Sequence, residues 1–226
     1  MFRLREFDPP KRVQIAIKNM FIIMAYTLTV TLFLAINYYY KRYSFFSEHI
    51  SNLGSMDPNN IPLNTRSMII MIIGFGLNSA LMLSVAIIYF VKRKQLKGAI
   101  VKGSLGIVLA FGAAGVAIPL DHPQLRILHI IGAACFIGGF AAFNAFLQIT
   151  SSYRKIVKKE VDARRADTIW DITLSFIVIG VLILYFVTFA LDQVGIGASW
   201  HLGPIFQKII VFIEILALYF IDNKDV

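Results

Sequence analysis

The sequence contains a single cysteine, Cys135, which lies inside a long apolar run. One cysteine excludes an internal disulfide, and without a second thiol a cysteine-based metal site is excluded as well. Charged residues make up only 15% of the 226 residues, and no polar stretch is long enough to form a soluble domain. There is also no His-x-x-x-His or His-Glu-x-x-His pair, so the local zinc-binding motifs of common hydrolases are missing.

Apolar side chains, in contrast, account for 58% of the residues, which is typical of a polytopic membrane protein. Six apolar runs are each long enough to cross about 30 Å of hydrocarbon at about 1.5 Å per residue. They are predicted at residues 18–39, 67–91, 103–120, 125–150, 170–191 and 204–221. The expected fold is all-α: residues 1–226 form one domain, a polytopic integral membrane bundle of six transmembrane helices.

The basic residues lie at the ends of the apolar runs, which argues against the nucleic-acid binding that a net charge of +9 would otherwise suggest. Seventeen of the 22 Lys and Arg residues fall in the N-terminal segment, the second and fourth connections and the C-terminal tail. Because basic connections stay on the cytoplasmic side, both termini are predicted to be cytoplasmic and the odd-numbered connections to face outward. The predicted location is the plasma membrane, as a multi-pass protein.

The connection between the third and fourth runs is a short turn, IPLDHPQLRILH at residues 118–129. Pro119 ends the run before it, and Pro123 suits the first turn of the next helix, with Asp121 or His122 as its N-cap. The two helices are therefore expected to form a tight hairpin. Rows of small residues four apart favour close packing between them; these are Gly106, Ala110 and Ala114 in one helix and Ala134, Gly138 and Ala142 in the other.

Two further segments carry unusual polar residues. Residues 45–54, with the sequence FFSEHISNLG, are expected to form an amphipathic segment that lies on the membrane surface. In the second run, Asn78 is expected to form a hydrogen bond to another helix, because an amide at mid-depth in a membrane needs a partner. Glu214 lies near the middle of the sixth run, where an ionisable group is costly and points to function.

The four histidines come from three different connections and all fall near the predicted outward interface. The functional hypothesis is an outward-facing polar pocket that binds a lipid headgroup or another amphiphile, with Arg126 and Lys208 available for phosphate. The alternative is that the histidines are unrelated and only tolerated at an interface. The residues predicted to bind the ligand are His49, Ser51, Asp121, His122, Arg126, His129, His201, Gln207 and Glu214.

A sharper hypothesis places a metal ion in this pocket, with an acid activating water. The candidate ligands are His129, His122, His49, His201 and Asp121, and the candidate metal is zinc; no cofactor is required by the sequence. His122 and His129 share a helix face but stand about 10 Å apart along the axis at about 1.5 Å per residue, which is marginal for one tetrahedral ion. A metal site would therefore need ligands from different helices.

Helix one followed by SEHISNLG (residues 47–54), together with the Pro-Asp-His turn and His129, resembles the prokaryotic "domain of unknown function 998" membrane proteins. That family is distantly similar to the Frag/DRAM/Sfk group of six-helix proteins. The matching positions are Ser51, Leu53, Gly54, Asp121 and His129, whereas Asn52 stands where the family commonly has Asp. The resemblance covers nearly the whole chain and implies a six-helix integral membrane protein, with links to membrane-lipid handling in some relatives but no settled reaction.

The leading hypothesis is a membrane protein that binds or handles a membrane lipid or amphiphile without catalysing a reaction. Its expected partners are membrane lipids and not nucleic acid, and the sequence leaves a homo-oligomer open. The first alternative is a metal-dependent intramembrane hydrolase of lipid amides or esters, similar to the alkaline ceramidase type, although the seven helices and the His-x-x-x-His pair of that type are absent. The second alternative is a small-solute transporter, with Glu214 and Asn78 as the midplane groups.

Overall fold

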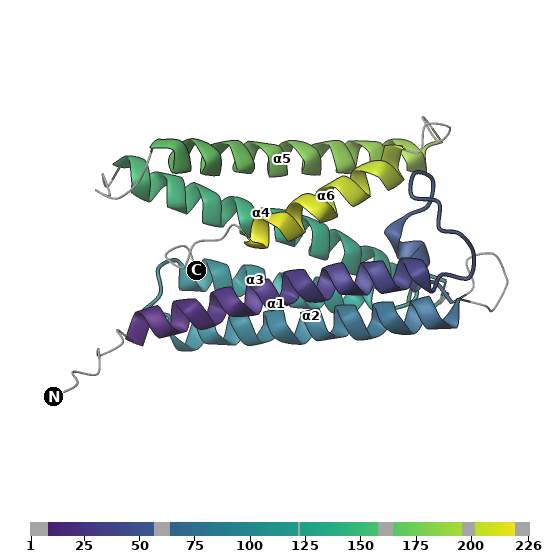
Figure 1. Cartoon of the computed structure of the whole chain (residues 1–226), viewed down its shortest axis with the longest axis horizontal. Helices are drawn as coiled ribbons and strands as arrows, with labels where there is room; N and C mark the ends of the chain where they lie inside the picture. Colours follow the sequence, from purple (N-terminus) through teal and green to yellow (C-terminus); the bar gives the residue numbers. More distant parts are fainter. Residues whose placement is uncertain (1–8, 57–63, 122, 158–164, 196–201, 220–226) are drawn as a thin grey trace.

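The structure is a computed structural model that describes residues 9–56, 64–121, 123–157, 165–195 and 202–219. These residues form the α-helices α1 (Pro9–Asn37), α2 (Thr65–Val91), α3 (Ala99–Val116), α4 (Arg126–Val157), α5 (Arg165–Gln193) and α6 (Leu202–Tyr219), and a short 3-10 helix, η1 (Ile50–Gly54) (Figure 1). Six of them are long and apolar enough to cross a membrane. The chain is therefore an all-α, multi-pass integral membrane protein with six membrane-spanning helices, as the apolar runs predict.

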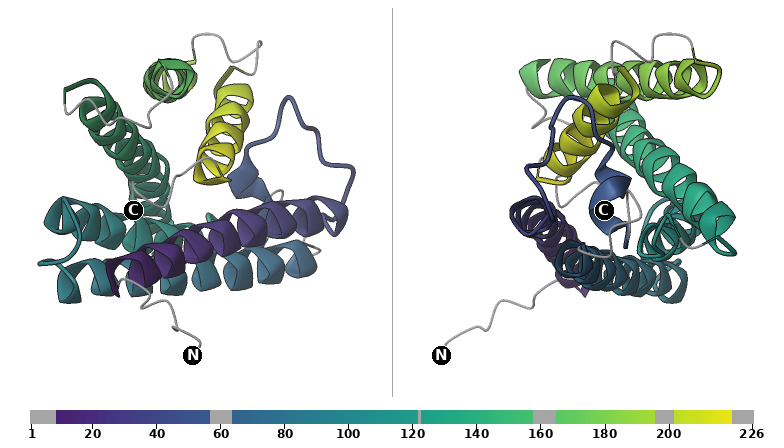
Figure 2. Two further views of the ribbon diagram at one scale, coloured as in Figure 1. Left: turned by 60° about the vertical axis from the view of Figure 1, so that its left-hand side comes forward. Right: turned by 90° about the vertical axis from the view of Figure 1, so that its right-hand side faces the viewer.

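The six long helices form a ring in which each packs against the next one along the chain. α6 completes the ring by returning to α1, and it also contacts α4 across the interior. The right-hand view of Figure 2 shows η1 surrounded by the ends of these helices. We call this the η1 end of the bundle; the described chain begins at the opposite end (Figure 1).

The turn between α3 and α4 differs from its prediction. α3 begins after Gly98, whose φ of 65° lies in the left-handed region that glycine tolerates, and it ends at Val116. It ends there because Pro119 offers no N–H and disfavours helical geometry in the residue before it. α4 begins only at Arg126, so Pro123 lies in the turn, and the prediction of an N-cap at Asp121 is wrong.

α3 and α4 pack as a hairpin whose backbones touch at glycines. A Cβ atom added to Gly115 would lie 2.5 Å from the Cα of Gly132, and one added to Gly112 would lie 2.4 Å from the backbone nitrogen of Phe136. Neither distance leaves room for a methyl group, so the contact requires glycine at these positions.

The face of this contact is not the predicted one. Gly106 packs against Ala86 of α2, since a Cβ atom there would lie 3.0 Å from that side chain. Other members of the predicted rows are exposed, namely Ala114, Ala134 and Ala142. The glycines that do make the contact, Gly112 and Gly115, are three residues apart, so a row of small residues four apart does not include both of them.

Candidate functional site

The end of the segment predicted to be amphipathic, residues 45–54, packs into the bundle, whereas Phe45 and Phe46 at its start are exposed. Within η1, Leu53 is fully buried and Gly54 is buried as well. η1 contacts α1, α2 and α6, and Figure 2 shows it between their ends. Helices distant in sequence supply hydrogen-bond partners for this part of the segment, which no local pattern in the sequence reveals.

Two fully buried side chains at the start of α2 hold η1 from one side. The Nδ2 of Asn64 donates hydrogen bonds to the carbonyl oxygens of Ser55 at 2.6 Å and of Leu53 at 3.2 Å. The Oγ of Ser67 lies 2.8 Å from the carbonyl oxygen of Leu53 and 2.9 Å from that of Ala35. A buried carbonyl without a partner costs about 1–3 kcal/mol, so these contacts stabilise η1 in its place.

Two neighbouring residues of α6 hold the segment from the other side. The Oε1 of Gln207 accepts a hydrogen bond of 2.8 Å from the N–H of Ile50. The Nζ of Lys208 donates to the carbonyl oxygens of Glu48 and of Pro204, the latter at 3.1 Å. The last membrane helix is therefore tied to the first connection.

Lys208 carries a buried positive charge, with only 7% of the residue exposed. Its Nζ lies 5.4 Å from the ring centroid of Tyr43 and 5.3 Å from that of Phe45, which are cation–π distances. The carboxylate of Glu48 is instead paired with Lys41, at 2.7 Å. In the part of the chain that the structure describes, Lys208 thus has carbonyl and aromatic partners but no ion pair.

Tyr43 and Lys41 both stay protonated at neutral pH. Burial, reinforced by the charge of Glu48, raises the pKa of Tyr43, so this tyrosine stays neutral and donates a hydrogen bond of 2.9 Å to the Glu48 carbonyl oxygen. The hydrogen bond to Glu48 raises the pKa of Lys41, so Lys41 remains charged at neutral pH. Glu48 is therefore already neutralised by Lys41.

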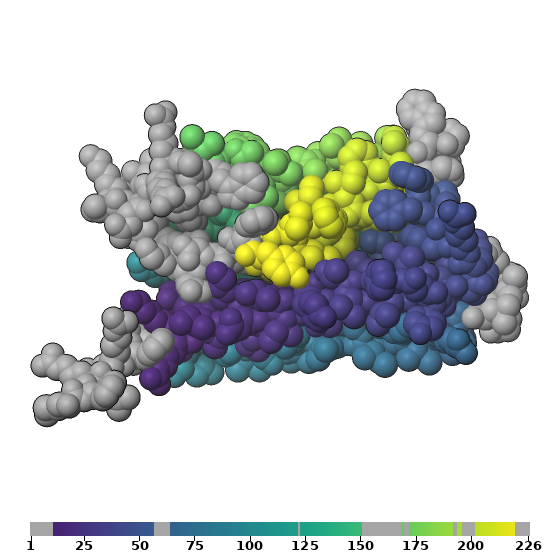
Figure 3. Space-filling model, viewed as in Figure 1, coloured from purple at the N-terminus to yellow at the C-terminus, as the bar shows by residue number. Residues whose placement is uncertain are grey.

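A cavity of about 780 Å³ lies between α1 and α6 and ends beneath the first connection. We call it the α1–α6 groove; Figure 3 shows this face, with α6 in yellow beside α1 in purple. It opens sideways, because Phe33 and Phe212 in its walls are 66% and 62% exposed. The lining is hydrocarbon or phenyl except for Thr29, Tyr43, Lys208 and Tyr219.

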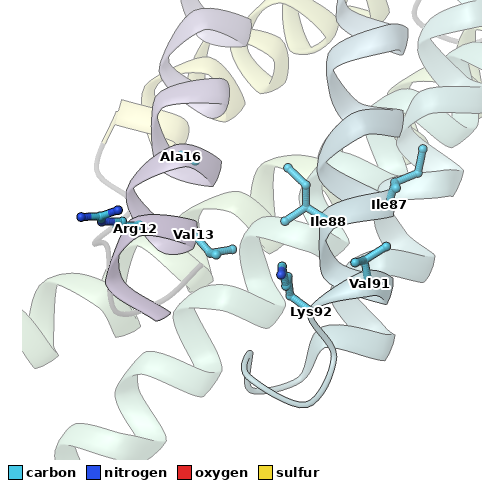
Figure 4. A pocket seen from close by; sticks show the side chains of 7 residues that line it. All are labelled: Arg12, Val13, Ala16, Ile87, Ile88, Val91 and Lys92. Carbon is cyan, nitrogen blue, oxygen red and sulfur yellow. The ribbon is translucent and has the colours of Figure 1, made fainter. Parts of the chain in front are cut away.

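A second, smaller cavity of about 420 Å³ lies near the opposite end, between the start of α1 and the end of α2. Figure 4 shows Val13, Ile88 and Lys92 turned toward the space between the two helices, whereas Arg12 projects away from it. Its lining contains two basic residues, Arg12 and Lys92, and is otherwise apolar. None of the residues predicted to bind a ligand lies there or, among described residues, in the α1–α6 groove.

Two of the predicted site residues support the turn between α3 and α4. The Oδ1 of Asp121 accepts a hydrogen bond of 3.0 Å from the N–H of Met56, which joins this turn to the first connection. His129 is buried, and its Nδ1 lies 2.6 Å from the carbonyl oxygen of Ile118. A carbonyl oxygen only accepts, so Nδ1 carries the hydrogen of this bond.

The other predicted residues are dispersed. His49 and Ser51 lie at the start of η1, close to Gln207 through the Ile50 contact, whereas Arg126 is exposed at the start of α4. Glu214 is fully buried two turns further along α6. His122 and His201 lie outside the described residues.

The described part of the chain shows no cluster of metal-ligating side chains. No group of three or more His, Cys, Asp or Glu side chains there could hold a metal ion. A histidine that donates to a carbonyl, as His129 does, is common among metal ligands, but that contact alone does not make a site. Zinc binding and the hydrolase hypothesis that depends on it stay predictions, which elemental analysis of the purified protein would check.

Asn64 and Ser67 were not identified from the sequence, although they hold η1. An asparagine directly before an apolar run is an ordinary helix N-cap signal, and the structure shows its amide turned to η1 instead. Ser67 gave no signal, because a serine inside a membrane helix usually bonds to its own helix. Lys208 was noted only as one of two cations available for phosphate.

Comparison with known proteins gives no relative of this chain. No protein family matches it, and no curated protein or solved structure is significantly similar to it.

Proposed function

We propose that this integral membrane protein binds a membrane lipid or a similar amphiphile in the α1–α6 groove. The observation that carries the proposal is the groove itself, with a volume of about 780 Å³ and a mostly hydrocarbon lining. This volume falls in the range of about 300–1,000 Å³ that is usual for small-molecule sites. The proposal keeps the ligand class predicted from the sequence but moves the site away from the histidines.

The dimensions of the groove suit an acyl chain. Its lining on α6 extends from Ile205 to Tyr219, which is about 21 Å at about 1.5 Å per residue. One leaflet contributes about 15 Å of the roughly 30 Å hydrocarbon layer. The groove is therefore long enough to hold the acyl chain of a lipid from one leaflet.

The exposure of the walls favours a ligand that enters from the membrane. α1 and α6 are both candidate membrane spans, so a side opening between them faces hydrocarbon. The polar groups of the lining are confined to a few positions, and the hydroxyl of Thr29 already donates to the carbonyl oxygen of Ala25 at 2.8 Å. A water-soluble ligand would find few partners along this lining, whereas an acyl chain needs none.

Filling the groove tests the proposal. Ile209 lines the groove and is 38% exposed, so Ile209→Trp adds bulk there with little effect on the core. Ile177→Trp is the matched control, because Ile177 is 42% exposed on α5 and lies outside the groove lining. We expect the lipid bound per protein, measured by native mass spectrometry after detergent extraction, to fall in Ile209→Trp only. Equal lipid content in both variants and the parent would refute the proposal.

A second candidate function, transport of a small solute or proton, is favoured by Glu214. This carboxyl group is fully buried near the middle of α6, and its Oε1 has no hydrogen-bond partner among the described residues. Such a group within a membrane is a candidate for a transport site. Asn78 supports this less, because its Nδ2 donates to the Gly74 carbonyl oxygen of its own helix at 2.8 Å, not to another helix as predicted. Solute or proton flux into liposomes that Glu214→Gln leaves unchanged would remove this candidate.

A further inference from the structure

The α1–α6 groove ends at a cation whose charge is not neutralised by the described residues. Lys208 lines the groove, is buried, and forms no ion pair in the described chain. The nearest acid, Glu48, is paired with Lys41 at 2.7 Å. Because a buried charge without a counter-charge is costly, an anion that reaches Lys208 would be stabilised there.

The hydrogen bonds of Lys208 leave capacity for such an anion. An ammonium group has three N–H donors. Those of Lys208 serve two described acceptors, the carbonyl oxygens of Glu48 and Pro204. The rings of Tyr43 and Phe45 hold the ammonium by cation–π contacts but accept no conventional hydrogen bond. One N–H therefore remains for an oxygen of a ligand.

The depth of Lys208 matches that of a lipid headgroup. It lies in the second turn of α6, at the same end of the bundle as the tyrosines 38–40 that follow α1. Tyrosines gather where hydrocarbon meets headgroups. Phe45 and Phe46, which are 55% and 67% exposed, line the groove at this end. A lipid whose chain occupies the groove would thus place its headgroup next to Lys208.

We infer that the groove selects a membrane lipid with an anionic headgroup, whose negative oxygen is bound by the ammonium of Lys208 while an acyl chain lies between α1 and α6. This inference rests on the proposed function and adds the chemical class of the lipid. Lys208 then has two roles, since it also holds the first connection through Glu48. A hydrogen bond from a charged donor favours the anionic headgroup, so a preference of about tenfold is expected, which corresponds to about 1.4 kcal/mol.

The experiment compares two lipids that share a phosphodiester group but differ in headgroup, since one is anionic overall and the other zwitterionic. Purified full-length protein in detergent is titrated with phosphatidylglycerol and, separately, phosphatidylcholine of the same acyl chains, and bound lipid is counted by native mass spectrometry. The parent protein is expected to prefer phosphatidylglycerol about tenfold. Lys208→Met and Lys208→Gln should bind both lipids with equal affinity, whereas Lys208→Arg should keep the preference. Lys41→Met is the control for a nearby exposed cation and should keep it too.

The outcomes separate this inference from the proposed function. If Ile209→Trp loses both lipids while the Lys208 variants lose only the preference, both statements stand. If the parent binds the two lipids equally, or if Lys208→Met keeps the preference, the inference is wrong and the lipid-binding function stands. If the parent binds neither lipid, both are wrong. Phosphatidylcholine binding reports an intact groove, so a Lys208 variant that binds this lipid is folded. If no Lys208 variant binds it, the titration of the parent protein alone decides whether the inference holds.

Discussion

The η1 end and the middle of the bundle both bury polar side chains, but they differ in how these side chains are used. At the η1 end, Asn64, Ser67 and Gln207 each contact a backbone group of the first connection or of α1. In the middle, Glu214 Oε1 and both amide atoms of Asn144 have no partner among the described residues. Buried polar groups are normally hydrogen-bonded. At the η1 end the Oδ1 of Asn64 and the hydroxyl of Tyr39 also lack partners in the described chain. The two regions differ because the Nδ2 of Asn64 holds η1, whereas Asn144 uses neither of its amide atoms in a described contact.

The largest effect is expected from breaking the η1 end at Asn64. Asn64→Ala removes the donor for two buried carbonyl oxygens and should lower the free energy of unfolding by about 2–3 kcal/mol. The measurement is the thermal midpoint of the detergent-solubilised protein. Asn37→Ala is the matched control, because the amide of Asn37 is exposed and donates only to Phe33 in its own helix, at 2.7 Å. Similar losses in both variants would mean that η1 is not held by this amide.

A smaller effect is expected in the middle of the bundle. Glu214→Gln keeps the size of the side chain and removes an ionisable group whose Oε1 is unpartnered, so stability should change by less than about 1 kcal/mol. If transport is the function, flux should fall while the thermal midpoint holds. A large drop in the midpoint would show instead that Glu214 supports the fold in the same manner as Asn64.

The smallest effect is expected for Arg126→Ala. Arg126 is exposed at the start of α4 and lies outside the lining of the α1–α6 groove. Bound lipid, counted by native mass spectrometry, should therefore match that of the parent. A loss of lipid as large as that from Ile209→Trp would favour the polar pocket predicted from the sequence over the groove.

The six spans could be predicted because a membrane helix is specified locally. A run of apolar residues of sufficient length satisfies its own backbone hydrogen bonds and needs no distant partner. The hairpin of α3 and α4 followed from the short turn between them. The contact face of this hairpin could not be predicted in the same way. Gly112 and Gly115 are as plausible as Gly106 and Ala110 as contact residues, and only packing against both α2 and α4 decides among them.

The site could not be predicted in the same way, because it depends on contacts between distant segments. Residues 45–54 have the pattern of a surface segment, and nothing local reveals that Gln207 and Lys208 bind Ile50 and Glu48. His49 and His129 were predicted to belong to one cluster. In the structure, His49 lies directly before η1, whereas His129 lies against the carbonyl oxygen of Ile118. Residue type alone therefore could not give the partners of these groups.

The bonds from α6 to the first connection also fix the order in which the protein can be completed. Gln207 lies 157 residues after Ile50, and Lys208 lies 160 residues after Glu48. During synthesis, the earlier connection must therefore wait for the final span before its N–H and carbonyl groups find these partners. A nascent chain interrupted before that span would also lack one wall of the groove, so ligand capacity and structural maturity should arise together.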